Sequence, residues 1–167
     1  NHILSLITLV YIKYQYQKYY QAKDILNSLL KRKDLSRNEK GMILLLLGFI
    51  KSKEIAKAGL FNKIINANSI KDLFKKAVVL APDLPETHLG LGTFYLFAPR
   101  IIGGDIRKAK KHLEIALKIA PNFATAYARL AQVYKKEGDF NNYRLYLEKA
   151  KRIDPENEVV NEEMSKK

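Results

Sequence analysis

The stretches APDLPETHLGLGTFY (residues 81–95) and APNFATAYARLAQVY (120–134) repeat one pattern at a spacing of 39 residues. A Gly-Asp pair follows each stretch and leads into a second segment that ends in Pro: GDIRKAKKHLEIALKIAP (104–121) and GDFNNYRLYLEKAKRIDP (138–155). The two second segments match each other at a spacing of 34 residues. Apolar residues at helical spacing on both sides of a turn predict a helical hairpin, repeated along the chain.

The length and the residue types of this unit resemble the tetratricopeptide repeat. A single repeat of this kind cannot bury its apolar stripe alone, so neighbouring repeats stack and share a core. The resemblance implies an all-α fold, a superhelical α-α solenoid of about four helical hairpins with a C-terminal capping segment. The positions shared by the second segments are Gly104/Gly138, Asp105/Asp139, Leu113/Leu147, Glu114/Glu148, Ala116/Ala150, Ile119/Ile153 and Pro121/Pro155.

Composition favours a single repeat domain over residues 1–167. The chain is 47% hydrophobic and 28% charged, which is enough to bury one sizeable core. The absence of cysteine excludes disulfides and thiolate metal sites. Reading backwards from the clear repeats, we expect hairpins at about 1–33, 36–81, 84–120 and 122–154, followed by a polar tail over 156–167 that forms a final helix or frays.

Two capping signals lie in the second predicted hairpin. Ser36 and Glu39 are spaced as in a capping box and predict the start of its first helix. Ser69 with Asp72 has the same spacing and predicts a second helix over 69–82. The first helix is then expected to break near Gly59, leaving residues 61–68 as an irregular connection or a short helix.

The turn of the third hairpin contains an insertion. LFAPRIIG (96–103) takes the place of KKE (135–137), which adds five residues. Pro99 lacks the amide hydrogen that a helix interior needs, and the following Gly103-Gly104 pair can adopt positive φ, so we expect an ordered loop. Its four large apolar residues, Leu96, Phe97, Ile101 and Ile102, either pack back on the neighbouring hairpin or form a partner interface or the lip of a ligand cleft.

No catalytic or metal-binding pattern is present. His2, His88 and His112 lack neighbouring cysteines and the paired spacing of HExxH, and His88 takes the place of a core aromatic residue. The glycines do not form a phosphate loop, because no strand precedes them and no GK[ST] follows. We therefore expect a protein that is not an enzyme and that needs no metal or cofactor.

The chain carries a net charge of +13, from 30 Lys+Arg and 17 Asp+Glu. Such a charge attracts anionic partners, and nucleic-acid binding is one alternative function. The lysines, however, alternate with core-facing residues along the predicted helices, as solvated helix faces do. Five tyrosines fall within residues 11–20. They either stack on bases or, as their helical spacing favours for Tyr16 with Tyr20 or Tyr11 with Tyr14, pack between helices.

In tetratricopeptide proteins the concave surface is lined by the first helix of each repeat, and the resemblance implies a binding surface there. The carboxylate clamp of chaperone-binding members needs Lys and Asn one turn apart, but these places hold Leu89 and Thr93, or Ala128 and Gln132. A protein or peptide partner, an apolar ligand or an amphipathic helix fits this surface better, and a homo-oligomer is a further option. With the apolar loop, the candidate residues are Glu86, Leu89, Thr93, Phe97, Ile101, Ile102, Thr125, Arg129, Gln132 and Lys136.

The stretch from Pro99 to Leu117 is similar to the T components of tripartite ATP-independent periplasmic (TRAP) transporters. These are helical-repeat lipoproteins or periplasmic proteins that associate with a solute-binding protein and guide a hydrophobic small molecule, which gives an alternative function in transport. The chain does not begin with Met, which favours a periplasmic or membrane-anchored lipoprotein over a cytoplasmic protein. Its apolar runs, residues 3–12 and 42–50, are too short to span a bilayer and predict buried helices.

Overall fold

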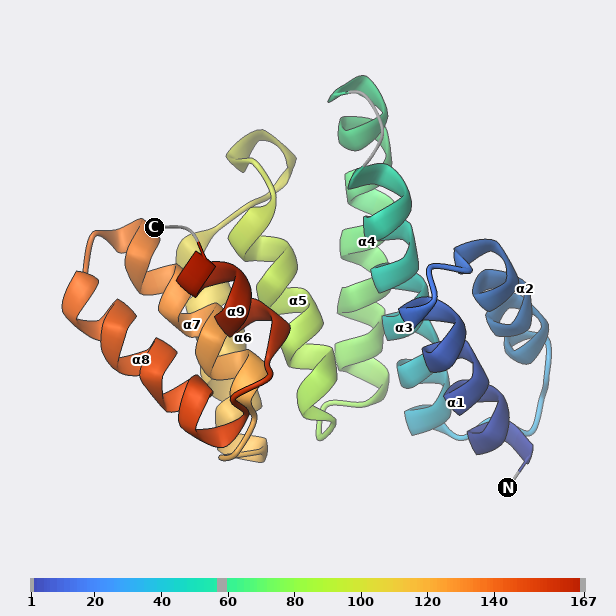
Figure 1. Cartoon of the computed structure of the whole chain (residues 1–167). Helices are drawn as coiled ribbons and strands as arrows, with labels where there is room; N and C mark the ends of the chain where they lie inside the picture. The colour runs from blue at the N-terminus through green and yellow to red at the C-terminus, as the bar shows by residue number, and fades with distance from the viewer. Residues whose placement is uncertain (1, 57–59, 166–167) are drawn as a thin grey trace. The chain divides into compact units, whose positions relative to one another are not determined.

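Helices form the regular structure of the described residues, and most of them pair into hairpins. The computed structural model describes the backbone of residues 2–56 and 60–165, and within these ranges the side chains outside residues 56–65. Within these residues no strand is present, so the all-α fold predicted from the sequence is confirmed (Figure 1). The helices are α1 (His2–Gln15), α2 (Tyr19–Leu30), α3 (Arg37–Ala56), α4 (Leu60–Leu80), α5 (Pro85–Phe97), α6 (Ile106–Ile119), α7 (Ala124–Glu137), α8 (Phe140–Ile153) and α9 (Glu158–Ser165).

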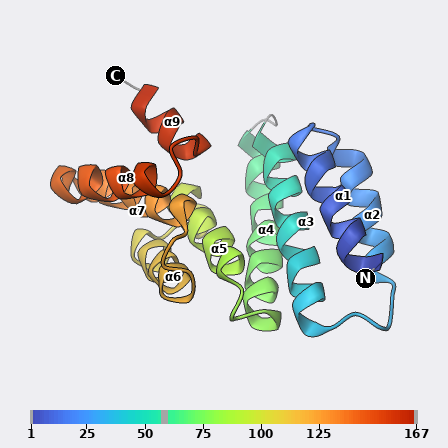
Figure 2. The same ribbon diagram turned by 60° about the horizontal axis from the view of Figure 1, so that its bottom comes forward.

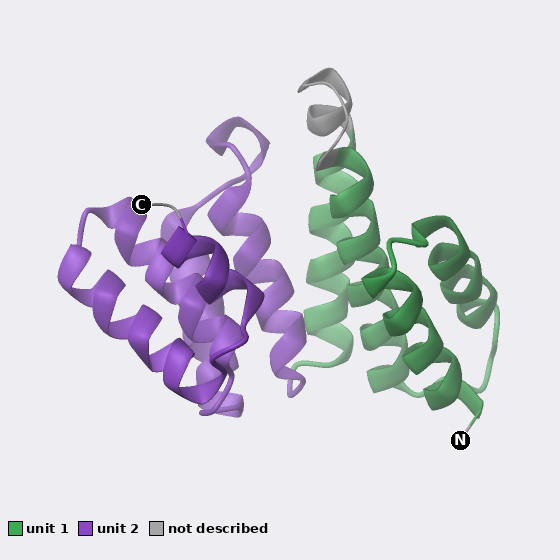
Figure 3. Cartoon of the chain, in the orientation of Figure 1, with its two compact units in different colours: residues 1–82 green, residues 83–167 purple. Residues whose placement is uncertain are grey.

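The chain divides into two compact units, residues 1–82 and residues 83–167 (Figure 3). Unit 1 contains the hairpins α1/α2 and α3/α4, and unit 2 contains α5/α6, α7/α8 and α9. In each unit the second helix of one hairpin packs against the first helix of the next, α2 on α3 and α6 on α7, which is the stacking that repeats require. That residues 1–167 act as one domain stays a prediction.

A buried apolar cluster of unit 1 lies between α1, α2 and α3 (Figure 2), and α4 adds Ile70, Phe74 and Ala77 to the core of this unit. The predicted capping box at the start of α3 is confirmed. The Glu39 carboxylate accepts a hydrogen bond from the Ser36 backbone N–H at 2.8 Å, and the Ser36 hydroxyl accepts one from the Glu39 N–H at 3.2 Å. The buried apolar residues of this core are Ile3, Val10, Ala22, Leu26, Leu29, Leu35, Ile43, Leu46, Leu47 and Ile50.

The second helix of the α3/α4 hairpin is longer than predicted. Residues 60–80 form one helix, so the prediction of an irregular connection or a separate short helix over 61–68 is wrong. Ser69 lies inside α4, where its hydroxyl donates to the Asn66 carbonyl at 2.8 Å, and it does not cap a helix with Asp72. A serine hydroxyl can bond a carbonyl of the preceding turn as readily as it can cap, and the spacing alone does not separate the two cases. The predicted break near Gly59 lies outside the described residues.

The tyrosine pairs predicted between helices are also wrong. Tyr11, Tyr16 and Tyr20 are 56%, 74% and 73% exposed, and the packed pair is Tyr14 with Tyr19, whose ring centroids lie 5.6 Å apart. The reason is the end of α1: the helix stops at Gln15, and Gln17 has a φ of 57°. Helical spacing therefore no longer applies between Tyr16 and Tyr20, which lie on either side of this turn. Tyr11 and Tyr14 both lie in α1, and their pairing fails because Tyr11 faces solvent.

Alanines allow the helices of unit 2 to approach closely. Ala109 and Ala116 of α6, Ala131 of α7 and Ala150 of α8 are fully buried. At these places a larger side chain would separate the two helices of a hairpin.

Among the described residues, no helix combines the length and the apolar composition needed to cross a bilayer.

Candidate functional site

The insertion between α5 and α6 is held closed at its base. The Asp105 N–H donates to the Tyr95 carbonyl at 3.0 Å, and between these two residues the chain forms a 3-10 helix, Arg100–Ile102. Gly103 follows with a φ of 97°, a left-handed conformation that favours glycine. The predicted ordered loop, which lengthens neither helix, is confirmed.

The apolar residues of this loop divide between core and surface. Leu96 is fully buried and Ile102 half-buried, whereas Phe97 is 51% exposed and Ile101 is 87% exposed. Leu96 therefore packs into unit 2, and the other end of the loop presents exposed apolar side chains. A partner interface or a ligand cleft at this end stays a prediction.

Phe97 is flanked by two cations of α7. The guanidinium carbon of Arg129 lies 5.1 Å from the centroid of the Phe97 ring, and the Lys136 Nζ lies 5.5 Å from it. Lys136 also donates to the Leu96 carbonyl at 2.5 Å, which ties the end of α7 to the end of α5. We call Phe97, Arg129 and Lys136 the cation–aromatic cluster. The negative face of the aromatic ring attracts both positive charges. The cluster can therefore bind an anionic group beside an apolar one.

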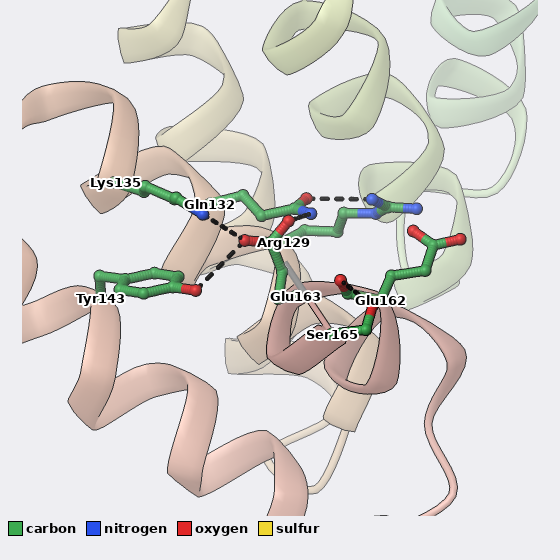
Figure 4. Close-up of polar contacts among 7 residues, drawn as sticks. All are labelled: Arg129, Gln132, Lys135, Tyr143, Glu162, Glu163 and Ser165. Atoms are coloured by element: carbon green, nitrogen blue, oxygen red, sulfur yellow. Dashed lines mark hydrogen bonds and ion pairs between the residues drawn. The ribbon is translucent and has the colours of Figure 1, made fainter. Parts of the chain in front are cut away.

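Arg129 continues into a chain of polar contacts that ends on α9 (Figure 4). Its Nη1 donates to Oε1 of Gln132 at 3.0 Å, and Nε2 of Gln132 donates to Oε1 of Glu163 at 3.0 Å. The other carboxylate oxygen of Glu163 accepts from Lys135 at 2.9 Å and from the Tyr143 hydroxyl at 3.2 Å. The hydrogen bond to Glu163 raises the pKa of Lys135 above its usual value. Gln132 and Glu163 are both buried.

The structure brings some predicted site residues together and sets others apart. Phe97, Arg129 and Lys136 form the cluster described above. Thr125 and Gln132 are instead engaged by the C-terminal segment: the Thr125 hydroxyl accepts from the side-chain amide of Asn157 at 3.0 Å, and Gln132 binds Glu163.

The α5 residues of the predicted surface have different surroundings. Leu89 is buried, whereas Glu86 and Thr93 are half-buried. The Oε2 atom of Glu86 is buried and finds no hydrogen-bond partner among the described residues. A role of all ten predicted residues in one binding surface stays a prediction.

Sequence analysis missed Tyr143 and Glu163 as parts of the site, and it left Lys135, a residue that can contact an anionic group, out of the candidate residues. Tyr143 stands where the repeat family usually has a small residue, which is a signal at the level of sequence. Its ring lies beneath Lys135, with Nζ 4.9 Å from the centroid, while its hydroxyl points to Glu163. Glu163 gave no such signal, because a glutamate in a polar tail is expected to be solvated until the docking of the tail is known.

Two histidines meet between α5 and α6. The Nδ1 atoms of His88 and His112 lie 3.0 Å apart, so one ring donates and the other accepts. Burial, followed by the nearby charges of His88 and Lys111, lowers the pKa of His112 to about 4. His88 is buried, as expected from its place in the core. Among the described residues, no group of three or more His, Cys, Asp or Glu side chains is placed to hold a metal ion.

Known proteins with similar sequence patterns or similar structures share the helical-hairpin architecture described above. A sequence model of the Tetratricopeptide repeat family matches residues 124–157, the α7/α8 hairpin and the segment that follows it. TTC0263, a thermophilic TPR protein of Thermus thermophilus, is similar with a TM-score of 0.74 and 16% identity over 97% of this chain and 82% of that one. YrrB, a TPR protein with an unusual peptide-binding site, has a TM-score of 0.62 and 16% identity over 93% and 71% of the two chains.

A third similar structure is the first TPR of Spaghetti (RPAP3), bound to the HSP90 peptide SRMEEVD. Its TM-score is 0.60, with 16% identity over 77% of this chain and 90% of that one. None of the curated proteins matches the sequence. At these identities the solved structures establish a tetratricopeptide-like fold, and the family match identifies a tetratricopeptide repeat over residues 124–157. The similarity to TRAP transporter T components stays a prediction.

Proposed function

We propose that the protein is a non-enzymatic interaction module that binds a protein or peptide through unit 2. The site consists of the cation–aromatic cluster and the exposed loop residue Ile101. The observation that carries the proposal is the exposure of Phe97, which is 51% open to solvent although Arg129 and Lys136 hold its ring in place. Because the ring is already positioned, the Phe97 side chain loses little conformational entropy when a ligand packs on it.

The chemistry of the site specifies the partner in outline. Phe97 and Ile101 offer apolar contacts, and Arg129 and Lys136 offer positive charge beside them. We expect a segment that presents an apolar side chain next to a carboxylate, held on a helix or in an extended strand. The similar structures support a partner of this class, since YrrB is described by its peptide-binding site and Spaghetti is bound to a peptide.

A displayed library of random peptides tests the proposal. Peptides selected on the wild-type chain are measured again with the double variant Phe97→Asp/Ile101→Asp, which we expect to weaken binding by about tenfold or more while the melting temperature changes little. Leu145→Asp is the matched control, because Leu145 is a similarly exposed apolar residue, 57% open, on α8 outside the site. Peptides that bind the double variant as tightly as the wild type would refute the proposed site.

The stability of the double variant decides how the experiment is read. Ile101 is 87% exposed, so Ile101→Asp alone cannot disturb the core. Should Phe97→Asp unfold unit 2, the single Ile101 variant then carries the test, and unchanged affinity for it would count against the loop as a contact.

A further inference from the structure

The C-terminal helix α9 covers part of the surface of α7 and α8. It is eight residues long, and one side of it is buried: Val159, Val160 and Glu163, with Asn157 just before the helix. The other side, including Glu158, is exposed. An isolated helix of this length is not stable in water, so α9 keeps its shape because it is docked.

The surface beneath α9 contains a site for a carboxylate. Gln132 Nε2, Lys135 Nζ and the Tyr143 hydroxyl converge on Glu163 at 3.0, 2.9 and 3.2 Å, from two different helices (Figure 4). Glu163 is 6% exposed, and a buried carboxylate needs several donors to compensate for the water it has lost. Without Glu163, the three donors would point at one position between α7 and α8 and would bind a carboxylate from another source.

Beside this carboxylate site lies an apolar surface formed by Tyr127 and Ala128 of α7 and Ala150 of α8, which we call the apolar seat. Val159 and Val160 of α9 pack on it. Val160 is fully buried and Val159 is 6% exposed. The surface thus recognises two adjacent branched apolar residues followed by a glutamate three positions later, all presented on one turn of helix.

The attachment of α9 is local. A short turn after α8 leads into it, where Asn157 accepts from the Val159 N–H at 3.2 Å and donates to Thr125 and Asp154. Among the residues that the structure describes, its contacts include one apolar pair, one carboxylate and this cap. Release of α9 would uncover the seat while the α7/α8 hairpin keeps its own packing, including the buried Ala131 and Leu130.

We infer that the surface of α7 and α8 beneath α9 is a binding site for an acidic helical segment of a partner protein, and that α9 occupies this site as an internal competitor. This inference rests on the proposed function, whose cation–aromatic cluster adjoins the site through Arg129 and Gln132. A partner segment with the Val-Val-x-x-Glu pattern displaces α9 and gains contact with both surfaces. Because α9 is tethered, its effective concentration is high and a free segment competes only when it adds contacts of its own.

The test uses the full chain and a synthetic peptide of residues 155–167. In the variant Val160→Asp the buried charge undocks α9, and we expect this variant to bind the peptide at least about tenfold more tightly than the wild type does. A peptide with the Glu163→Gln change is expected to bind the variant about tenfold more weakly, because the amide lacks the charge that Lys135 and Tyr143 recognise. Isothermal titration calorimetry measures each affinity, and circular dichroism confirms the fold.

A second variant keeps the test decisive if Val160→Asp disrupts more than α9. Glu163→Lys places an ammonium group against Lys135 and releases α9 without adding polar groups to the apolar seat. Folded variants that fail to bind the peptide, or that bind the Gln peptide equally well, would overturn the inference. Loss of cooperative unfolding in both variants would also overturn it, since α9 would then be an inseparable part of unit 2.

The outcome is separate from that of the proposed function. Peptides selected on the cation–aromatic cluster report on Phe97 and Ile101, which the 155–167 peptide does not need. If selected peptides bind and the 155–167 peptide does not, only the present inference fails. If the 155–167 peptide binds and the selected peptides are insensitive to Phe97→Asp/Ile101→Asp, only the proposed site at the loop fails.

Discussion

The two hairpins of unit 2 have the same base and different turns. In α7/α8 the Asp139 N–H donates to the Tyr134 carbonyl at 2.9 Å, and in α5/α6 the equivalent bond from Asp105 to Tyr95 is 3.0 Å long. Five more residues lie between the bonded pair in α5/α6. The hydrogen bond between Asp and Tyr thus joins the two helices of each hairpin in the same way. The turn between the two bonded residues can therefore become longer, and carry a binding surface, without a change in how the helices pack.

The aromatic contacts between the helices are also equivalent in position and different in chemistry. In α7/α8 the rings of Tyr127 and Tyr146 lie 6.0 Å apart, and the same places in α5/α6 hold His88 and His112, at 5.3 Å. One packing geometry therefore accepts either two imidazole rings or two phenol rings. Burial raises the pKa of Tyr146, which keeps it neutral over a wider range of pH.

The largest effect is expected at the glycine that precedes each Asp. In α5/α6 a Cβ added to Gly104 would overlap the carbonyl group of Ala98, so Gly104→Ala forces the loop apart and should cost about 2–4 kcal/mol. In α7/α8 a Cβ on Gly138 meets nothing within 4 Å, although its φ of 80° is unfavourable for alanine, and Gly138→Ala should cost only about 1 kcal/mol. Urea unfolding of both variants measures the difference. Equal costs would show that the loop is not pinned at Gly104.

An intermediate effect is expected at the small residues that the hairpins share. Ala116 and Ala150 occupy matching positions and are fully buried. Ala116→Leu or Ala150→Leu should therefore overpack its hairpin and lower the free energy of unfolding by about 1–3 kcal/mol. Replacement by serine, which is close to alanine in size, is the control for volume. Unchanged thermal melting of both leucine variants would contradict the alignment of the two hairpins.

A smaller, pH-dependent effect separates the histidine pair from the tyrosine pair. His112 has a pKa of about 4 in the folded chain against an ordinary value of 6.5, so protons bind it more readily in the unfolded chain. The free energy of unfolding is therefore unaffected above about pH 6.5 and decreases as the pH falls toward 4, by at most about 1.4 kcal/mol per pH unit for this residue. In the variant His88→Tyr/His112→Tyr, which copies α7/α8, this loss should disappear.

Urea unfolding at pH 7 and pH 5 measures the effect as the difference between wild type and variant. Carboxylates with lowered pKa values, such as Asp105 and Asp139, contribute to both chains and cancel in this comparison. An identical pH dependence of the two chains would show that the histidine pair has no role in the acid sensitivity.

The sequence predicted the structural features that recur in each repeat or that depend on neighbouring residues. The spacing of small and apolar residues predicted the hairpins, and the Ser36/Glu39 capping box and the ordered loop at Pro99 depend on neighbouring residues alone. The prediction at Ser69 was wrong because a hydroxyl can serve a helix interior or a helix start.

The polar contacts of the site were less accessible to sequence reasoning. Glu163 lies 31 residues from Gln132 and 28 from Lys135, and only the docking of α9 brings them together. The exposure of Phe97 beside a buried Leu96 likewise depends on how the loop leaves α5. Such features arise from tertiary packing, which the repeat pattern does not encode.

The central claim is that the insertion adds a binding surface to an otherwise ordinary hairpin, and one chimera tests it. Replacing residues 97–103 with Lys-Glu removes Phe97 and Ile101, keeps the buried Leu96 and gives α5/α6 a turn of the length found in α7/α8, with the closure between Tyr95 and Asp105 retained. Circular dichroism and the affinity for library-selected peptides are measured together. We predict a cooperatively folded, helical chain whose affinity falls by about tenfold or more. A chimera that unfolds, or one that binds as the wild type does, would contradict the account.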